Sequence, residues 1–304
     1  MSTVDFFVRF NEYLKRRFPL WQFLPLSAAL AFTANLVGSK MLPTHPINFS
    51  FFAASFLGLV LFFFHLRVFD EFKDYDHDLK NYPERPVPSG LIKLDELRFV
   101  GIIAIFAEIL ISMFSGVNTV IIYFICLGYS MLMYKEFFIR QWLRSKFTLY
   151  IILHEVLVFP LMFFLFSFQV KSFSLLLSPT LIFLSVYLGL GLFLMEVARK
   201  IRPHELEVSS KDTYTANYGI IGATVLLLTI ALLMFVSQLI IINNLGKLSL
   251  IVGIGDLLLF LILLLFSILF MHDPLKTSSK KLFISSGLFM LFSNIFLSVS
   301  LLFF

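Results

Sequence analysis

The sequence predicts an all-α, polytopic membrane protein with about nine transmembrane helices. Three observations lead to this fold class. Hydrophobic residues make up 59% of the 304 positions, charged residues make up only 14%, and the mean hydropathy is +0.92. A soluble chain of this length needs more polar surface than such a composition supplies. Apolar runs of about 20 residues, the length that a bilayer-crossing helix requires, recur along the chain.

Nine apolar runs are long enough to cross a bilayer. They lie at 20–38, 48–66, 97–114, 117–134, 148–168, 177–196, 218–242, 248–270 and 283–303. The segment before the first run places apolar side chains on one helical face, with cations beside them. These apolar residues are Phe6, Phe7, Phe10 and Leu14. The pattern predicts an interfacial helix within residues 1–19. No small-residue cleavage site follows the first run, so we expect no cleavable signal peptide.

Lysine and arginine divide unevenly between the two sides of this nine-helix topology. One side receives 21 of the 24, which leaves Lys40, Lys171 and Lys247 on the other. Cytoplasmic loops of membrane proteins carry the excess of positive charge. We therefore expect a cytoplasmic N-terminus and an outside C-terminus, in the inner membrane of a prokaryotic cell. The net charge of +5 fits anionic lipid. Nucleic acid is excluded as a partner, because no soluble basic domain exists to bind it.

The most informative polar segment, RVFDEFKDYDHDLKNYPERPVPSG at 67–90, directly follows the second apolar run. Asp70, Asp74 and Asp78 are four residues apart, so they form one acidic stripe on a helix, which Glu71 widens. Neighbouring carboxylates repel one another. A divalent cation that binds them together with a phosphorylated ligand explains such a row at a membrane boundary. The alternative is a solvated loop with ordinary charges.

The same segment supplies candidate phosphate-binding cations, namely Arg67, Lys73 and Arg85. Three prolines at positions 83, 86 and 88 end the predicted helix, and Ser89-Gly90 predicts a turn. Because Arg85 lies within this rigid turn, we expect it to reach back toward a phosphate.

A second polar constellation follows the sixth apolar run. Glu196, Arg199 and Lys200 share a helical face there. A carboxylate beside two cations at the end of a transmembrane helix can complete a metal–diphosphate site. The alternative is a cationic flank that only sets the orientation of the helix.

Two further segments contain candidate site residues. Lys135 and Arg140 follow the fourth run and can contact phosphate, although a cationic flank explains them equally well. His154 and Glu155 lie within the fifth run, where ionisable groups are costly. They are expected to contact an acceptor or act as a base, or else to form a polar pair between helices.

The aspartate stripe and the turn after it resemble a known motif. Asp70-x3-Asp74-x3-Asp78, followed by Arg85-Pro86-x-Pro88-Ser89-Gly90, resembles the first motif of the UbiA superfamily of intramembrane prenyltransferases, N-x-x-x-D-x-x-x-D and then R-P-x-x-x-G. The nine predicted helices and the cytoplasmic N-terminus are similar to that family's fold. The resemblance implies a single domain over residues 1–304, with the helices around a central cavity open to the cytoplasmic side.

The resemblance also implies roles for individual residues. Asp74 and Asp78 would hold Mg²⁺ bound to a prenyl diphosphate, and Asp70 stands where the family often has Asn. The family's second motif is of the D-x-x-x-D type. This chain departs from it with Glu196-x3-Lys200, although Asp212-Thr213 and Gly219 resemble the end of that region. The expected catalytic and metal-binding set is Asp70, Asp74, Asp78 and Glu196. Lys135 would fill the place of the family's cation after the fourth helix.

The function implied by the resemblance is Mg²⁺-dependent transfer of a prenyl group. The donor would be a polyprenyl diphosphate, and the acceptor would be an unidentified aromatic or lipid molecule. Pyrophosphate would be released. The altered second motif leaves open a non-catalytic protein that binds or transports prenyl lipids on the same scaffold. A membrane phosphotransferase of the CDP-alcohol type is another alternative, although its D-G-x-x-A-R segment does not occur in this sequence.

Overall fold

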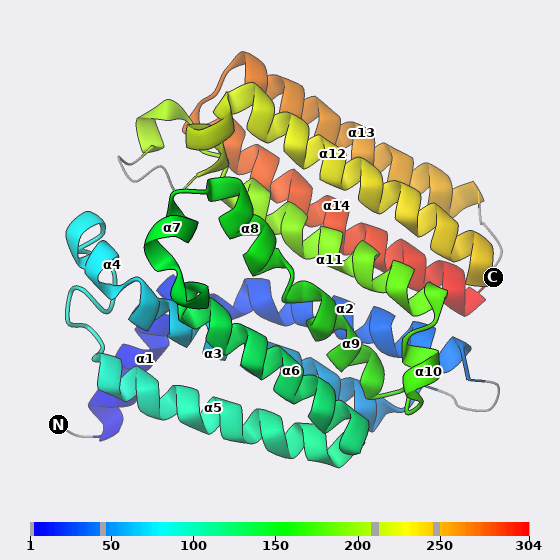
Figure 1. Cartoon of the computed structure of the whole chain (residues 1–304). Coiled ribbons are helices and arrows are strands. Elements are labelled where there is room, and N and C mark those ends of the chain that lie inside the picture. The colour runs from blue at the N-terminus through cyan, green and yellow to red at the C-terminus, as the bar shows by residue number, and fades with distance from the viewer. Residues whose placement is uncertain (1–2, 43–46, 208–212, 246–249, 304) are drawn as a thin grey trace. The chain divides into compact units, whose positions relative to one another are not determined.

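A computed structural model describes residues 3–42, 47–207, 213–245 and 250–303, and every regular element in these ranges is a helix. Nine candidate membrane spans occur in this part of the chain, which confirms the predicted fold class (Figure 1). The spans are Leu20–Lys40, Phe49–Lys73, Leu94–Ser115, Val117–Tyr134, Phe147–Ser167, Pro179–Arg199, Tyr214–Asn243, Val252–His272 and Lys276–Phe303.

The chain divides into two compact units. The first unit comprises Met1–Ala31 and Asn48–Lys171, and the second comprises Phe32–Ile47 and Ser172–Phe304. Elements that lie mainly or wholly in the first unit are α1 (Thr3–Arg17), α2 (Leu20–Lys40), α3 (Phe49–Lys73), α4 (Tyr75–Asn81), α5 (Leu94–Ser115), α6 (Val117–Tyr134), η1 (Glu136–Phe138), α7 (Arg140–Arg144), α8 (Phe147–Glu155) and α9 (Val158–Ser167). Those of the second are α10 (Phe173–Leu176), α11 (Pro179–Arg199), η2 (His204–Leu206), α12 (Tyr214–Leu245), α13 (Leu250–His272) and α14 (Lys276–Phe303).

The first unit is organised around α3, which packs against α5, α6 and α9. A core cluster joins Tyr13 and Phe18 near the end of α1 to Phe64 and Val68 on α3. On the predicted apolar face of α1, Phe6, Phe10 and Leu14 pack against this cluster, whereas Phe7 is exposed.

The helix α1 is fixed to the first unit by an ion pair as well. Arg9 donates to both oxygens of Glu96 at 2.9 and 2.7 Å, and Glu96 also accepts from the backbone N–H of Lys93 at 2.8 Å. Glu96 therefore caps the start of α5 and holds α1 beside it.

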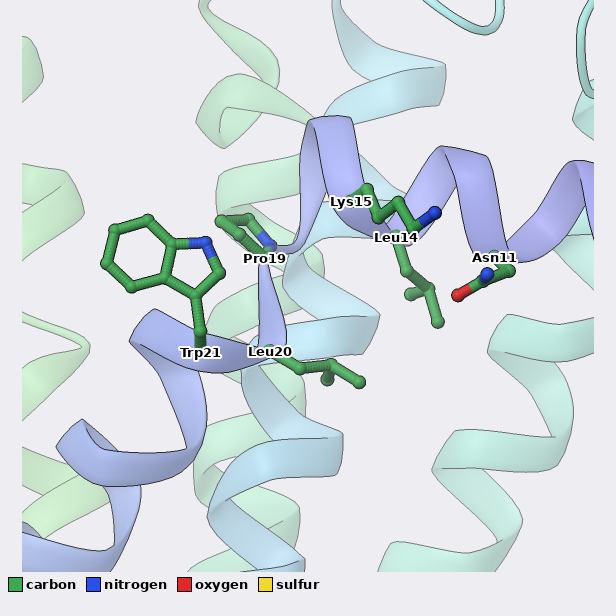
Figure 2. A pocket seen from close by; sticks show the side chains of 6 residues that line it. All are labelled: Asn11, Leu14, Lys15, Pro19, Leu20 and Trp21. Carbon is green, nitrogen blue, oxygen red and sulfur yellow. The ribbon is translucent and has the colours of Figure 1, made fainter.

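A surface pocket of about 190 Å³ opens where α1 meets α2. Figure 2 shows that its lining comes from both sides of the bend at Pro19. The lining residues are Asn11, Leu14, Lys15, Pro19, Leu20 and Trp21. They include no carboxylate, so this pocket is separate from the aspartate stripe. The exposed Trp21 ring is typical of a residue at a membrane–water interface.

A buried polar group links three helices of the first unit. Nδ1 of His65 on α3 lies 2.9 Å from both carboxylate oxygens of Glu108 on α5. The hydroxyl of Tyr123 on α6 donates to Glu108 at 3.0 Å, and His65 Nε2 lies 3.4 Å from the Ser130 hydroxyl. Because polar groups in an apolar interior need partners, these contacts favour one arrangement of α3, α5 and α6.

The fifth predicted span is not one continuous helix. α8 ends at Glu155 and α9 begins at Val158. Pro160 lies in the first turn of α9 and has no N–H to donate to the carbonyl four residues earlier. The N–H of Phe159 instead makes the tighter bond to the carbonyl of Val156, at 3.2 Å. The apolar run from 148 to 168 indicated the length of the span but not this break.

In the second unit, α12 and α14 each pack against both α11 and α13. A buried polar network joins the four helices. The Tyr187 hydroxyl donates to Gln238 at 3.2 Å, and the Gln238 amide donates to Asp256. The Ser293 hydroxyl donates to the other oxygen of Asp256 at 2.8 Å. Asp256 therefore receives hydrogen bonds from neutral donors on two other helices.

We expect the replacement Glu108→Leu to lower the free energy of unfolding of the full chain. His65 and Tyr123 would lose their acceptor, at about 1–3 kcal/mol for each buried group left unsatisfied. Thermal unfolding in a fixed detergent measures the change. Asp95→Asn is the control, since its ion pair with Arg98 is exposed and such pairs contribute about 0–1 kcal/mol. Equal shifts in the two variants would contradict the assigned role of Glu108.

Candidate active site

The aspartate stripe lies where α3 passes into α4. Asp74 ends α3 and begins α4, with φ −102° and ψ 10°. The backbone still follows a helical path through this joint. The N–H of Asp74 donates to the Asp70 carbonyl at 2.9 Å, and the N–H of Asp78 donates to the Asp74 carbonyl at 2.8 Å. The three aspartates therefore follow one another at intervals of one helical turn.

The first two aspartates of the stripe are partly exposed, and each is paired with a cation. Asp70, whose side chain is 41% exposed, lies 2.9 Å from Lys73 and 3.8 Å from Arg67. Asp74 is 32% exposed and lies 3.1 Å from Arg144. Both carboxylates therefore have accessible oxygen atoms beside positive charge.

The third aspartate is buried. Asp78 is only 4% exposed and bonds to Arg85 at 2.5 Å, with Arg17 at 3.5 Å. The Arg85 guanidinium lies 3.7 Å from the centroid of the Tyr82 ring, and the N–H of Ser89 donates to the Arg85 carbonyl at 2.9 Å. These contacts fix the turn after α4; the sequence predicted a turn here, but not the contacts of Arg85 with Asp78 and Tyr82. Gly90 completes this turn with φ +76°, a conformation that L-residues rarely adopt.

A second buried carboxylate lies beside the stripe. Glu71 is bonded to Arg17 at 2.7 Å and to Arg67 at 3.2 Å. Since Arg17 also approaches Asp78, the end of α1 neutralises two carboxylates of α3 and α4 at once. Burial, followed by the charge of Arg67, lowers the pKa of Arg17.

The pKa of the Asp74 carboxyl is raised above its ordinary value. Its partial burial raises the pKa of its carboxyl, and the neighbouring carboxylates Asp70 and Asp78 raise it further. Lys73 and Arg144 act in the opposite direction without cancelling these effects. An additional cation beside Asp74 would therefore favour its ionised form.

The segment after α6 forms a left-handed turn. Glu136, Phe137 and Phe138 have φ values of 46°, 53° and 62°. Such a conformation costs an L-residue roughly 1–2 kcal/mol. The turn buries Glu136, which is 1% exposed and pairs with Arg144 at 2.7 Å and Arg140 at 3.0 Å. Burial acts to lower the pKa of Arg144, but the hydrogen bond and charge of Glu136 outweigh it and raise this pKa.

The opposite face of this turn is apolar and exposed. Phe138 is 77% exposed, and Ile139 and Trp142 beside it are also exposed. The sequence predicts Trp142 as an interface anchor, and its exposure is consistent with that prediction.

The predicted phosphate contacts in this segment differ in position. Arg140 reaches the end of α3, where it donates to the Lys73 carbonyl at 3.1 Å. Lys135 is exposed, and its ammonium lies 4.7 Å from the centroid of the neighbouring Tyr134 ring. Only Arg140 therefore contacts the helix that carries the stripe.

His154 is connected to the site through Tyr150. The two rings are stacked with centroids 4.0 Å apart, and His154 Nδ1 lies 2.7 Å from the Tyr150 carbonyl. The Tyr150 hydroxyl accepts from the Lys73 ammonium at 3.5 Å. Tyr150 is thus a site residue that sequence reasoning missed.

The second predicted constellation lies in the second unit. Glu196 is bonded to Arg199 at 2.6 Å and to Lys200 at 2.8 Å, so the predicted shared face exists. In the loop that follows, Glu207 accepts from Thr213 at 2.6 Å and from Thr215. Asp212 lies outside the described residues.

The first unit thus brings together most of the predicted site residues, and it adds others. The additions are Arg17, Glu136, Arg144 and Tyr150. Arg17 and Arg144 had a sequence signal, since both belong to the excess of positive charge on one side of the predicted topology, but that excess predicts orientation alone. Their pairing with α3 and α4 depends on tertiary packing.

The residues of the stripe fit a magnesium ion by the chemistry of their donors. Mg²⁺ prefers oxygen ligands and is usually held at phosphate sites by one or two carboxylates, the substrate phosphates and water. Asp70 and Asp74 supply two partly exposed carboxylates one helical turn apart. Within the described ranges, no group of three or more His, Cys, Asp or Glu side chains is arranged to hold a metal ion. The fit therefore depends on oxygen atoms that a phosphorylated ligand contributes.

Comparison with known proteins gives a family match and structural neighbours. The model of the UbiA prenyltransferase family matches residues 29–295. A structure of digeranylgeranylglyceryl phosphate synthase is similar with a TM-score of 0.57 and 16% identity, over 96% of this chain and 98% of that one. The apo structure of a UbiA homologue from Aeropyrum pernix K1 has a TM-score of 0.61 and 13% identity, over 88% and 96%. At these identities the likeness shows a shared fold. No curated protein matches the sequence.

We expect Asp78→Asn to destabilise the protein more than Asp70→Asn does. Asp78 is buried against Arg85, and a hydrogen bond to a charged group contributes about 1.5–3 kcal/mol. Asp70 is more exposed, so loss of its ion pair should cost about 0–1 kcal/mol. Thermal unfolding of both variants in one detergent, without divalent cations, measures the difference. An equal loss would show that Asp78 does not anchor the turn after α4.

Proposed function

Because this chain belongs to the UbiA prenyltransferase family, we propose that it is a Mg²⁺-dependent intramembrane prenyltransferase. The proposed reaction moves a prenyl group from a polyprenyl diphosphate to an aromatic or lipid acceptor and releases pyrophosphate. The family and its structural neighbours support prenyltransferase activity in an integral, multi-pass membrane protein. One observation supports placing this reaction at the aspartate stripe. Carboxylates and cations alternate there, at the end of a membrane-spanning helix.

Binding of the donor would exchange the partners of these charges. Asp70 and Asp74 are the residues proposed to hold Mg²⁺, which supplies charge neutralisation to the leaving diphosphate. Arg67, Lys73 and Arg144 would then turn from carboxylates to phosphate oxygens. Since the same cations pair with the aspartates without ligand, the exchange leaves no charge without a partner.

Asp78 and Arg85 are proposed to act differently from Asp70 and Asp74 when the donor binds. Their 2.5 Å bond fixes the turn after α4, and the guanidinium, which is about a quarter exposed, lies at the border of the site. A guanidinium has five N–H donors. Arg85 can therefore bind a phosphate with the donors that do not face Asp78. The family resemblance makes Asp78 a metal ligand. Its carboxylate would coordinate the metal ion only if Arg85 gave up its bond to Asp78.

The side chains act mainly by electrostatic stabilisation. The allylic carbon–oxygen bond breaks, and its electron pair stays on the pyrophosphate oxygen that the cations hold. The allylic carbon then forms a bond to the acceptor, which loses a proton. We assign His154 to the acceptor side, because it stacks on Tyr150, which contacts Lys73. Lys135 and Arg140 remain candidate phosphate contacts.

The second unit contributes Glu196, Arg199 and Lys200 to the proposal. Glu196 would be a further metal ligand, and the two cations would contact phosphate. Lys200, which stands where the family's second motif has an aspartate, favours the alternative, a protein that binds prenyl diphosphates without transferring the prenyl group. Family membership favours a prenyltransferase over a phosphotransferase of the CDP-alcohol type. The distribution of positive charge supports a cytoplasmic N-terminus, and a prokaryotic inner membrane is the proposed location.

We expect the full chain in lipid nanodiscs to release pyrophosphate from a prenyl diphosphate only when Mg²⁺ is present. The donor panel starts with geranylgeranyl diphosphate, and a membrane extract supplies acceptors. Asp74→Asn should reduce the rate by about 100-fold or more, as loss of a charge-stabilising group does. Asp76→Asn is the matched control, because Asp76 is exposed on α4. Full activity of Asp74→Asn, or release without Mg²⁺, would refute the proposed mechanism.

A second experiment distinguishes the enzyme from the binding protein. If Glu196 is a metal ligand, Glu196→Gln should raise the Mg²⁺ concentration for half-maximal pyrophosphate release several-fold. Glu205→Gln, an exposed residue of the next loop, serves as the control. Mg²⁺-dependent donor binding without release by the unchanged protein would favour the binding protein instead.

A further inference from the structure

The left-handed turn Glu136–Phe138 contains three consecutive residues that are not glycine. Residues held in such sparsely populated conformations persist only where their surroundings fix them. The turn removes Glu136 from solvent, next to two arginines of α7. A carboxylate in an exposed loop needs no such conformation. The backbone strain at Glu136 therefore points to a requirement that its carboxylate lie at this particular position.

The two arginines hold Glu136 and the end of α3 together. Arg144 uses Nε and Nη2 on Glu136 Oε1, at 2.8 and 2.7 Å, and the same Nη2 lies 3.1 Å from Asp74 Oδ1. Arg140 Nε forms an ion pair with Glu136, 3.0 Å from its Oε2, and the Nη2 of Arg140 donates to the Lys73 carbonyl at 3.1 Å. Glu136 thus directs both guanidinium groups at the joint between α3 and α4.

The charges of Glu136, Arg140 and Arg144 are balanced only while Asp74 is paired with Arg144. Glu136 and Asp74 together compensate Arg140 and Arg144. When Asp74 engages a metal ion, one positive charge remains beside the joint, on side chains that are 36% to 49% exposed. An anion bound next to that metal ion supplies the missing charge.

We propose that Glu136 is a positioning residue that holds Arg144 and Arg140 in place for the diphosphate of the donor. This inference rests on the proposed function, because it takes the diphosphate as the ligand. Glu136 itself does not contact the ligand and acts through Arg144 and Arg140. A purely structural role would predict loss of stability without a specific change in diphosphate affinity.

The test uses the full chain in nanodiscs and inorganic pyrophosphate with MgCl₂ as the probe. Glu136→Gln should raise the Kd for Mg²⁺–pyrophosphate about tenfold. Glu136→Asp should recover part of the affinity, because it keeps the charge and Asp tolerates the left-handed conformation better than most residues. In an Arg144→Gln background, Glu136→Gln should cause a smaller loss than in the unchanged protein, because only Arg140 then still depends on Glu136. Glu12→Gln, which removes a surface ion pair with Arg16, is the matched control.

A ligand-free measurement accompanies the binding assay. The rate at which phenylglyoxal modifies Arg144, followed by mass spectrometry, should rise several-fold in Glu136→Gln and stay unchanged in Glu12→Gln. An unchanged Kd, or an equal further loss in the Arg144→Gln background, would overturn the positioning role. If the unchanged protein does not bind Mg²⁺–pyrophosphate, the proposed function fails. The labelling rate then still tests whether Glu136 holds Arg144 in place, since an unaltered rate in Glu136→Gln refutes this part of the inference on its own.

Discussion

The first unit depends on one electrostatic constraint, that carboxylates at the end of a membrane-spanning helix need cations close by. At an effective dielectric of 20, two opposite charges 4 Å apart attract by about 4 kcal/mol, and a buried carboxylate without a partner loses that energy. The stripe on α3 and α4 meets the constraint with cations from three separate segments. Arg17 comes from α1, Arg85 from the turn after α4, and Arg144 from α7. The position of each segment follows from the carboxylate that it neutralises.

Helix content and spacing could be predicted from the sequence because they depend on local patterns. Apolar runs indicated the nine spans, and Asp70, Asp74 and Asp78 indicated one helical path. Proline and glycine marked the turn that ends at Gly90. The joint at Asp74 was not predictable, because the sequence there favours a helix throughout and the interruption depends on packing around α4.

The partners that come from other segments of the chain could not be predicted, since these pairs join residues far apart in the sequence. Arg17 and Glu71 are separated by 54 positions, and Arg144 and Asp74 by 70. In the sequence, both arginines are explained by membrane orientation. Glu136 had a still weaker signal, because an isolated acidic residue in a basic loop is common. Its importance emerges only from its burial and from the backbone conformation that buries it.

The exposed apolar side chains of the turn after α6 connect the site to its surroundings. Phe138, Ile139 and Trp142 point away from the same short segment that holds Glu136 inside. They are apolar, so whatever medium surrounds the protein solvates them, and a change of medium acts on the turn from its outer face. The lipid or detergent is in this sense a structural component of the arginine geometry beside Asp74. Bilayer composition is therefore a condition to hold fixed when donor binding is compared between variants.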